Sequence, residues 1–121
     1  MARLSSKNLS VQGNNVSILN EVSVTFGPEE LVGVIGPNGA GKTTLLKSLL
    51  GLLKPSSGDI TLDGKTLGSW GRIDIAKRIG YLAQGAPCHW PMTVERIVEI
   101  GCSPHSLPLW GIDAEDRKMV E

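Results

Sequence analysis

The stretch LVGVIGPNGAGKTTLLKSLLGLL (residues 31–53) is the part of the sequence that says most about the fold. It begins with a continuous apolar run at 31–36, which is typical of a strand covered on both faces in a parallel sheet. A glycine-rich loop follows, and apolar residues then recur at helical spacing over 42–53. A strand, a glycine-rich loop and a helix in this order predict an α/β fold in which the loop opens the helix.

The loop fits the phosphate-binding pattern Gly36-x-x-x-x-Gly41-Lys42-Thr43. Backbone N–H groups at a helix N-terminus bind dense negative charge, and glycines let the backbone curl closely around it. Lys42 supplies a cation for the β- and γ-phosphates, and the Thr43 hydroxyl can bind Mg²⁺. The alternative, a chance match in a glycine-rich turn, does not explain the apolar run before the loop or the helix after it. The predicted nucleotide-binding residues are Gly36, Asn38, Gly39, Ala40, Gly41, Lys42, Thr43 and Thr44.

Shorter elements surround this central stretch. Apolar–polar alternation over 4–11 and 16–26 predicts two half-buried, antiparallel strands joined by the turn QGNN. Thr93 and Gly101 are the predicted caps of a short helix between them. The other predicted elements are a strand and turn at 59–64, a helix at 72–78, a buried strand at 79–84 that ends at Gln84, and a helix start at 113–121.

Composition and charge exclude several classes of protein. The chain has 121 residues, and its 12 basic and 12 acidic residues are interspersed, so no basic footprint indicates a nucleic-acid partner. Cys88 and Cys102 lie at no metal-ligand spacing and are expected to be reduced thiols in a cytosolic protein. No apolar run reaches the length of a bilayer, and residues 1–10 lack the apolar segment of a signal peptide.

The stretch GVIGPNGAGKTTLLKSLLGLLKPSSGDITLDG resembles the ATP-binding domain of ABC (ATP-binding cassette) transporters. The resemblance implies a P-loop NTPase fold, with an ABC-type core, an antiparallel β subdomain and the start of a helical subdomain. In this family a strand ends in a glutamine, and here IGYLAQ ends in Gln84. The resemblance implies that Gln84 is a catalytic residue that senses the γ-phosphate. It also implies ATP and Mg²⁺ as cofactors, with Thr43 and Gln84 as metal ligands.

The stretch HWPMTVERIVEIGCSPH (residues 89–105) resembles importer ATPases for iron–siderophore complexes, hemin and cobalamin, although Cys102 stands where those proteins usually carry arginine. The resemblance implies a homodimeric cytoplasmic subunit, peripheral on the inner face of the cell membrane. Its loop from Gly85 to Met92 would contact a transmembrane permease. A periplasmic or surface substrate-binding protein would deliver the cargo to that permease. Many relatives stack adenine on an aromatic residue near position 13. Because none is present here, adenine is expected to pack on Val11 or Val16.

The resemblance covers the whole chain but only the first half of the family domain. Residues 1–92 would form the β subdomain, P-loop core and Q-loop, and residues 93–121 would begin the helical subdomain. The LSGGQ signature, the acidic Walker B strand and the switch histidine would lie beyond Glu121. The chain alone is therefore expected to be inactive as an ATPase. Two alternatives stay open, a nucleotide-binding fragment that does not hydrolyse ATP and an inert truncated gene product.

Overall fold

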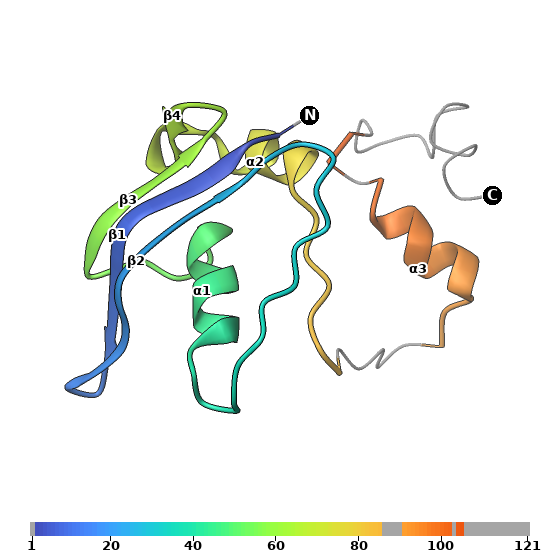
Figure 1. Cartoon of the computed structure of the whole chain (residues 1–121). Coiled ribbons are helices and arrows are strands. Elements are labelled where there is room, and N and C mark those ends of the chain that lie inside the picture. The colour runs from blue at the N-terminus through green and yellow to red at the C-terminus, as the bar shows by residue number, and fades with distance from the viewer. Residues whose placement is uncertain (1, 86–90, 103, 106–121) are drawn as a thin grey trace. The chain divides into compact units, whose positions relative to one another are not determined.

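The computed structural model describes residues 2–85, 91–102 and 104–105 (Figure 1). The chain divides into two compact units, residues 1–71 and 72–121. Among the described residues, the first unit holds every strand, the helix α1 (Lys42–Leu49) and the short 3-10 helix η1 (Leu67–Ser69). The second holds the helices α2 (Arg72–Arg78) and α3 (Val94–Ile100).

A β-hairpin begins the first unit. The strands β1 (Leu4–Gly13) and β2 (Val16–Phe26) pair in antiparallel orientation, with Gly13 opposite Val16. The two turn residues, Asn14 and Asn15, have φ angles of 47° and 62°. A type I′ turn needs positive φ at both central positions, which asparagine tolerates better than most residues. The predicted pair of antiparallel strands is confirmed.

A second hairpin completes the sheet. The strand β3 (Ser57–Leu62) pairs with the other edge of β1, and β4 (Lys65–Thr66) pairs with β3, giving the order β2-β1-β3-β4 (Figure 1). Asp63 and Gly64 form the turn with φ angles of 51° and 77°. All of these pairings are antiparallel, and the strand and turn predicted at 59–64 are confirmed.

The helix α1 is shorter than predicted, because it ends at Leu49 and not at residue 53. Gly51 has a φ of 73°, the left-handed conformation that stops a helix. Its N–H donates to the Ser48 carbonyl at 3.0 Å, and the Leu52 N–H donates to the Lys47 carbonyl at 2.9 Å. These two bonds form a Schellman motif, which satisfies carbonyls that the helix end leaves open. Gly51 therefore ends the helix.

The core of the first unit lies where α1 packs against β1 and β2 (Figure 1). Leu9 and Val11 are buried and lie two positions apart in β1, and Ile60 and Leu62 do the same in β3. Since side chains two positions apart in a strand point to the same face, each pair faces one side of the sheet. Ser48 of α1 is fully buried, but its hydroxyl donates to the Thr44 carbonyl at 2.8 Å and is satisfied. The buried apolar side chains of the unit are Leu9, Val11, Leu19, Leu49, Ile60, Leu62 and Leu67.

Leu62→Ala is expected to lower the free energy of unfolding by about 2–5 kcal/mol, because it removes a side chain of zero exposure and leaves a cavity. Leu52→Ala is the matched control, since Leu52 is 63% exposed and its truncation should cost less than about 0.5 kcal/mol. Urea unfolding followed by circular dichroism measures both. Equal losses in the two variants would contradict this description of the core.

Two predicted buried strands are not formed. Residues 31–36 and 79–84 have no regular secondary structure, and all but one of their side chains are exposed. The exposed fractions of Leu31, Ile35 and Leu82 exceed 90%. A parallel strand forms only when neighbouring strands satisfy its N–H and C=O groups. Within the described chain no strand pairs with either segment, so the apolar pattern alone does not produce a strand.

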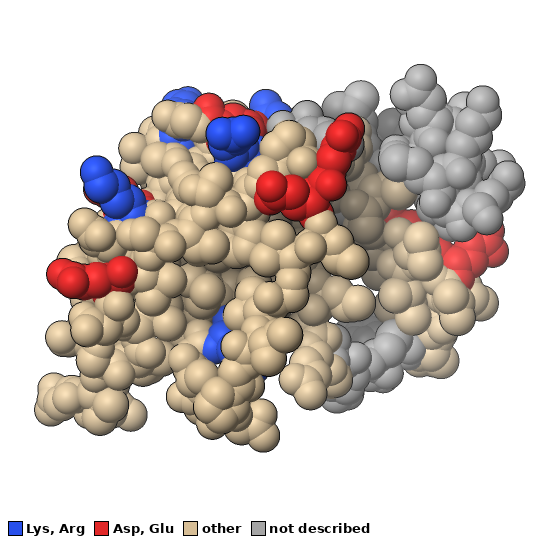
Figure 2. Space-filling model, viewed as in Figure 1, with Lys and Arg blue, Asp and Glu red and all other residues tan. Residues whose placement is uncertain are grey.

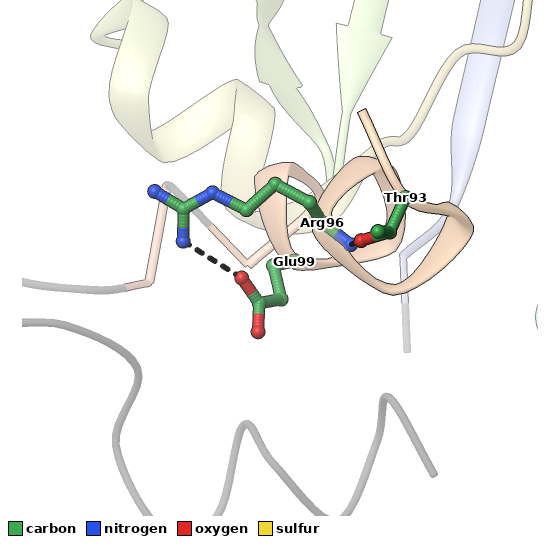
Figure 3. Close-up of polar contacts among 3 residues, drawn as sticks. All are labelled: Thr93, Arg96 and Glu99. Atoms are coloured by element: carbon green, nitrogen blue, oxygen red, sulfur yellow. Dashed lines mark hydrogen bonds and ion pairs between the residues drawn. The ribbon is translucent and has the colours of Figure 1, made fainter. Parts of the chain in front are cut away.

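The two helices of the second unit match the predictions at 72–78 and 93–101. Thr93 caps α3, and its hydroxyl accepts a hydrogen bond from the Arg96 N–H at 3.2 Å (Figure 3). One turn along, Arg96 Nη1 lies 2.8 Å from Glu99 Oε2 (Figure 3).

None of the described helices is long and apolar enough to cross a membrane. The helix start predicted at 113–121 lies outside the described residues.

Candidate nucleotide-binding site

The glycine-rich loop lies between β2 and the N-terminus of α1 (Figure 1). The Ala40 N–H donates to the Pro37 carbonyl at 3.2 Å, which makes a tight turn around Asn38 and Gly39. Gly39 and Gly41 have φ angles of 85° and 92°. Both positions thus use a conformation that glycine adopts without steric cost.

Gly41 fixes the loop to the sheet. A Cβ at this position would lie 2.9 Å from Leu19 Cδ2 and 3.1 Å from the Ile18 carbonyl oxygen. At Gly39, by contrast, a Cβ would meet nothing within 4 Å. The loop is therefore held against β2 at its end and is open to solvent at its middle.

The first turn of α1 presents backbone donors. Its first intrahelical bond runs from the Leu45 N–H to the Gly41 carbonyl at 2.8 Å, so the N–H groups of residues 42–44 precede the helical ladder. The N-cap is Gly41, which has no side chain to accept from them, and no acid lies in this turn. Such an end carries a partial positive charge and favours an anion.

Lys42 brings the only full positive charge of residues 36–44. Its ammonium folds back and donates to the carbonyls of Gly36 and Pro37, the second at 2.8 Å. On the face shown in Figure 2, basic and acidic side chains are interspersed over the first unit. Within the loop itself, Lys42 and the helix end are therefore the groups that attract an anion.

The comparisons with known proteins agree with this geometry. A family model described as "ABC transporter" matches residues 19–119. The chain belongs to the ABC transporter family. The predicted family is therefore confirmed, and it is a family of ATPases.

Individual relatives of this ABC transporter chain are importer subunits by name. A hemin import ATP-binding protein of Escherichia coli O157:H7 is 38% identical over 104 residues, which cover 84% of this chain and 40% of the relative. A petrobactin import ATP-binding protein of Bacillus anthracis is 37% identical over 103 residues, covering 85% of this chain and 38% of the relative. The chain thus spans about two fifths of the lengths of these relatives.

A solved structure described as the ATP binding subunit of an ABC transporter superimposes with a TM-score of 0.74. It is 27% identical and covers 88% of this chain and 44% of that chain. The predicted fold class, an ABC-type core with an antiparallel β subdomain, is confirmed.

The predicted phosphate-binding residues of this ABC transporter chain all lie within residues 36–44 of the first unit. Gln84 is an exposed turn residue of the second unit. Its predicted role beside the phosphates stays a prediction. The predicted permease loop is described only in part, since residues 86–90 lie outside the described residues.

One further sequence prediction changes in detail. Val11 is only 3% exposed and cannot contact adenine, whereas Val16 is 64% exposed, so one of the two predicted aliphatic contacts remains. Cys102 is buried.

Sequence reasoning missed the partners of the loop. The carbonyls of Gly36 and Pro37 hold the Lys42 ammonium, and Ile18 and Leu19 of β2 lie against Gly41. The alternation in VSILN predicts a strand but not the element that packs on it. These contacts join residues far apart in sequence or involve backbone atoms, which no residue pattern specifies.

Proposed function

We propose that this chain is the ATP-binding part of an ABC importer, and that the whole protein couples ATP hydrolysis to uptake across a membrane. One observation carries the proposal, namely the open N–H groups at the start of α1 beside the Lys42 ammonium. A triphosphate needs many donors and a cation at close range, and this arrangement offers both. The family match supports the same conclusion.

We further propose that the loop holds ATP together with Mg²⁺. Because Gly39 and Gly41 carry no Cβ, the backbone of the loop can approach phosphate oxygens closely. Thr43 is exposed in the first turn of α1, and a hydroxyl oxygen is a suitable ligand for Mg²⁺. Gln84 offers a second oxygen ligand. The bound metal would neutralise charge on the phosphates, while the residues of this chain orient them.

The partners and cargo follow from the relatives and stay proposals. Relatives named for hemin import and petrobactin import suggest an iron chelate or hemin as cargo. Only the sequence resemblance supports cobalamin as a cargo. The whole protein would act as a homodimer on the inner face of the cell membrane. Its loop from Gly85 to Met92 would contact the permease, and a substrate-binding protein would deliver the cargo. A boundary between residues 92 and 93 would separate the core from the helical subdomain.

We expect residues 1–121 by themselves to bind ATP without hydrolysing it. The loop and the first turn of α1 hold no carboxylate that could position an attacking water. ATP binding should therefore be measurable in this chain while ATP hydrolysis is absent.

Displacement of a fluorescent ATP analogue tests the proposed function. Unlabelled ATP and inorganic triphosphate, each with Mg²⁺, should displace the analogue, because the loop recognises phosphates. Adenosine should displace it poorly, because only Val16 remains as a predicted contact for the base. Displacement by adenosine as strong as by ATP would show that the analogue binds elsewhere and would overturn the assignment.

Thr43→Val should weaken the contribution of Mg²⁺ to nucleotide binding, because valine keeps the shape of threonine but loses the oxygen ligand. The ratio of the ATP affinities with and without Mg²⁺ is expected to fall about tenfold, as for the loss of one good polar contact. Titrations of the variant and the parent chain in magnesium and in EDTA measure this ratio. An unchanged ratio would exclude the Thr43 hydroxyl as a metal ligand.

A further inference from the structure

We propose that Asn38 is a site of spontaneous deamidation, through a cyclic imide formed with Gly39, and that this reaction inactivates the phosphate loop. Asn38 is the only one of the five asparagines of the chain that precedes a glycine. It lies at the centre of the exposed turn between Pro37 and Ala40. Asparagine is among the thermally labile residues, and a following glycine removes the side chain that would obstruct cyclisation.

The reaction balances with water as its only co-reactant. The backbone nitrogen of Gly39 loses its proton and attacks Cγ of Asn38. A bond forms between these two atoms, the bond from Cγ to Nδ2 breaks, and ammonia leaves. Water then opens the imide at either carbonyl. One product is aspartate, and the other is isoaspartate, in which the main chain runs through the former side chain.

The geometry of the turn permits this cyclisation. The peptide between Asn38 and Gly39 must rotate until the nitrogen approaches Cγ. A Cβ on Gly39 would meet nothing within 4 Å, and both residues are exposed. Within the described residues, no hydrogen bond holds the Asn38 side chain or the Gly39 N–H. The bond from Ala40 to Pro37 spans the turn without involving either group.

Other turns of the first unit serve as comparisons. Asn14 and Asn15 are also exposed turn residues, but they precede Asn15 and Val16, whose side chains hinder attack by the nitrogen. Asp63 precedes Gly64, but its carboxylate accepts the Arg3 N–H at 2.7 Å, and cyclisation there would change no charge. Asn38 therefore combines a reactive sequence, an open turn and a change of charge.

The functional consequence rests on the proposed function. Either product places a carboxylate among the groups that would surround the phosphates, and isoaspartate also lengthens the main chain of the loop. A like charge about 4 Å from a phosphate is expected to weaken binding about tenfold or more. Bound nucleotide should in turn slow the reaction, because a loop closed around phosphates cannot rotate its peptide.

Ageing of the intact chain tests the proposal. The chain is incubated at mildly alkaline pH with and without MgATP, and peptide mass spectrometry follows each asparagine. Asn38 should convert well before Asn14 and Asn15, to a mixture of aspartate and isoaspartate. Conversion of Asn38 no faster than that of Asn14 and Asn15 would overturn the proposal.

Binding measurements then separate this proposal from the proposed function. Ageing should lower the ATP affinity of the parent chain about tenfold, whereas it should not change the affinity of the Asn38→Ser variant. Conversion without loss of affinity would overturn the claim that the reaction inactivates the loop. If the fresh chain binds no ATP, the proposed function fails, while the mass spectra still decide whether Asn38 deamidates.

Discussion

Replacement of Lys42 by alanine is expected to reduce ATP affinity by about 100-fold, which corresponds to roughly 3 kcal/mol. The ammonium of Lys42 already donates to the Gly36 and Pro37 carbonyls in the loop. When phosphate binds there, the ammonium can exchange these neutral carbonyl acceptors for ionised phosphate oxygens, which bind it more strongly. Alanine removes the charge and the donors together, and no other cation lies within residues 36–44.

Lys47→Ala is the matched control, because Lys47 lies in the last turn of the same helix and is exposed. It changes the net charge by the same amount as Lys42→Ala, so a general electrostatic effect would appear in both variants. Fluorescence titration with Mg²⁺ measures both affinities. Binding retained in Lys42→Ala would mean that the loop matches the phosphate pattern but does not use it.

Gly58→Ala should lower the free energy of unfolding of the first unit by at least about 3 kcal/mol. Gly58 has a φ of 92° and lies in β3 opposite two residues of β1, Asn8 and Leu9, where the pairing register shifts. A Cβ on Gly58 would lie 2.3 Å from the Asn8 carbonyl oxygen and 2.7 Å from Leu9 Cα. These are backbone atoms of the central strand, so relief would require separation of β1 from β3.

Gly64→Ala separates the two contributions to this loss. Gly64 also has a positive φ, of 77°, but a Cβ there would meet nothing within 4 Å. Its replacement should therefore cost only the conformational part, about 1–2 kcal/mol. Chemical denaturation of the two variants gives the difference. Equal losses would show that the close approach of Gly58 to Asn8 and Leu9 does not exclude a side chain at position 58.

Elements specified by neighbouring residues could be predicted from the sequence. The turn of the hairpin at 4–26, the helix at 72–78 and the threonine cap of α3 all depend on contacts a few residues apart. The phosphate loop belongs to this group too, because its glycines and Lys42 are neighbours in sequence. For such elements, the periodicity of apolar residues and the turn residues carry most of the information.

Elements that depend on distant partners could not be predicted from the sequence. The apolar run at 31–36 has the composition of a buried strand, but composition supplies no hydrogen-bond partner. The end of α1 illustrates a different difficulty, because Gly51 and Pro55 are both stop signals and the earlier one takes effect. The acceptors of the Lys42 ammonium are backbone carbonyls, and their position becomes visible only in the folded loop.

The order of the sheet has a consequence for biosynthesis. Among the described residues, every strand partner of β1–β4 lies between residues 4 and 66, so this ladder can form once that part of the chain has left the ribosome. Domains fold as units during translation, N-terminal parts first. Arrested nascent chains ending beyond residue 71 should therefore already protect the sheet from proteolysis. The exposed apolar run at 31–36 would accompany that early fold, and it would give a chaperone an apolar segment to bind.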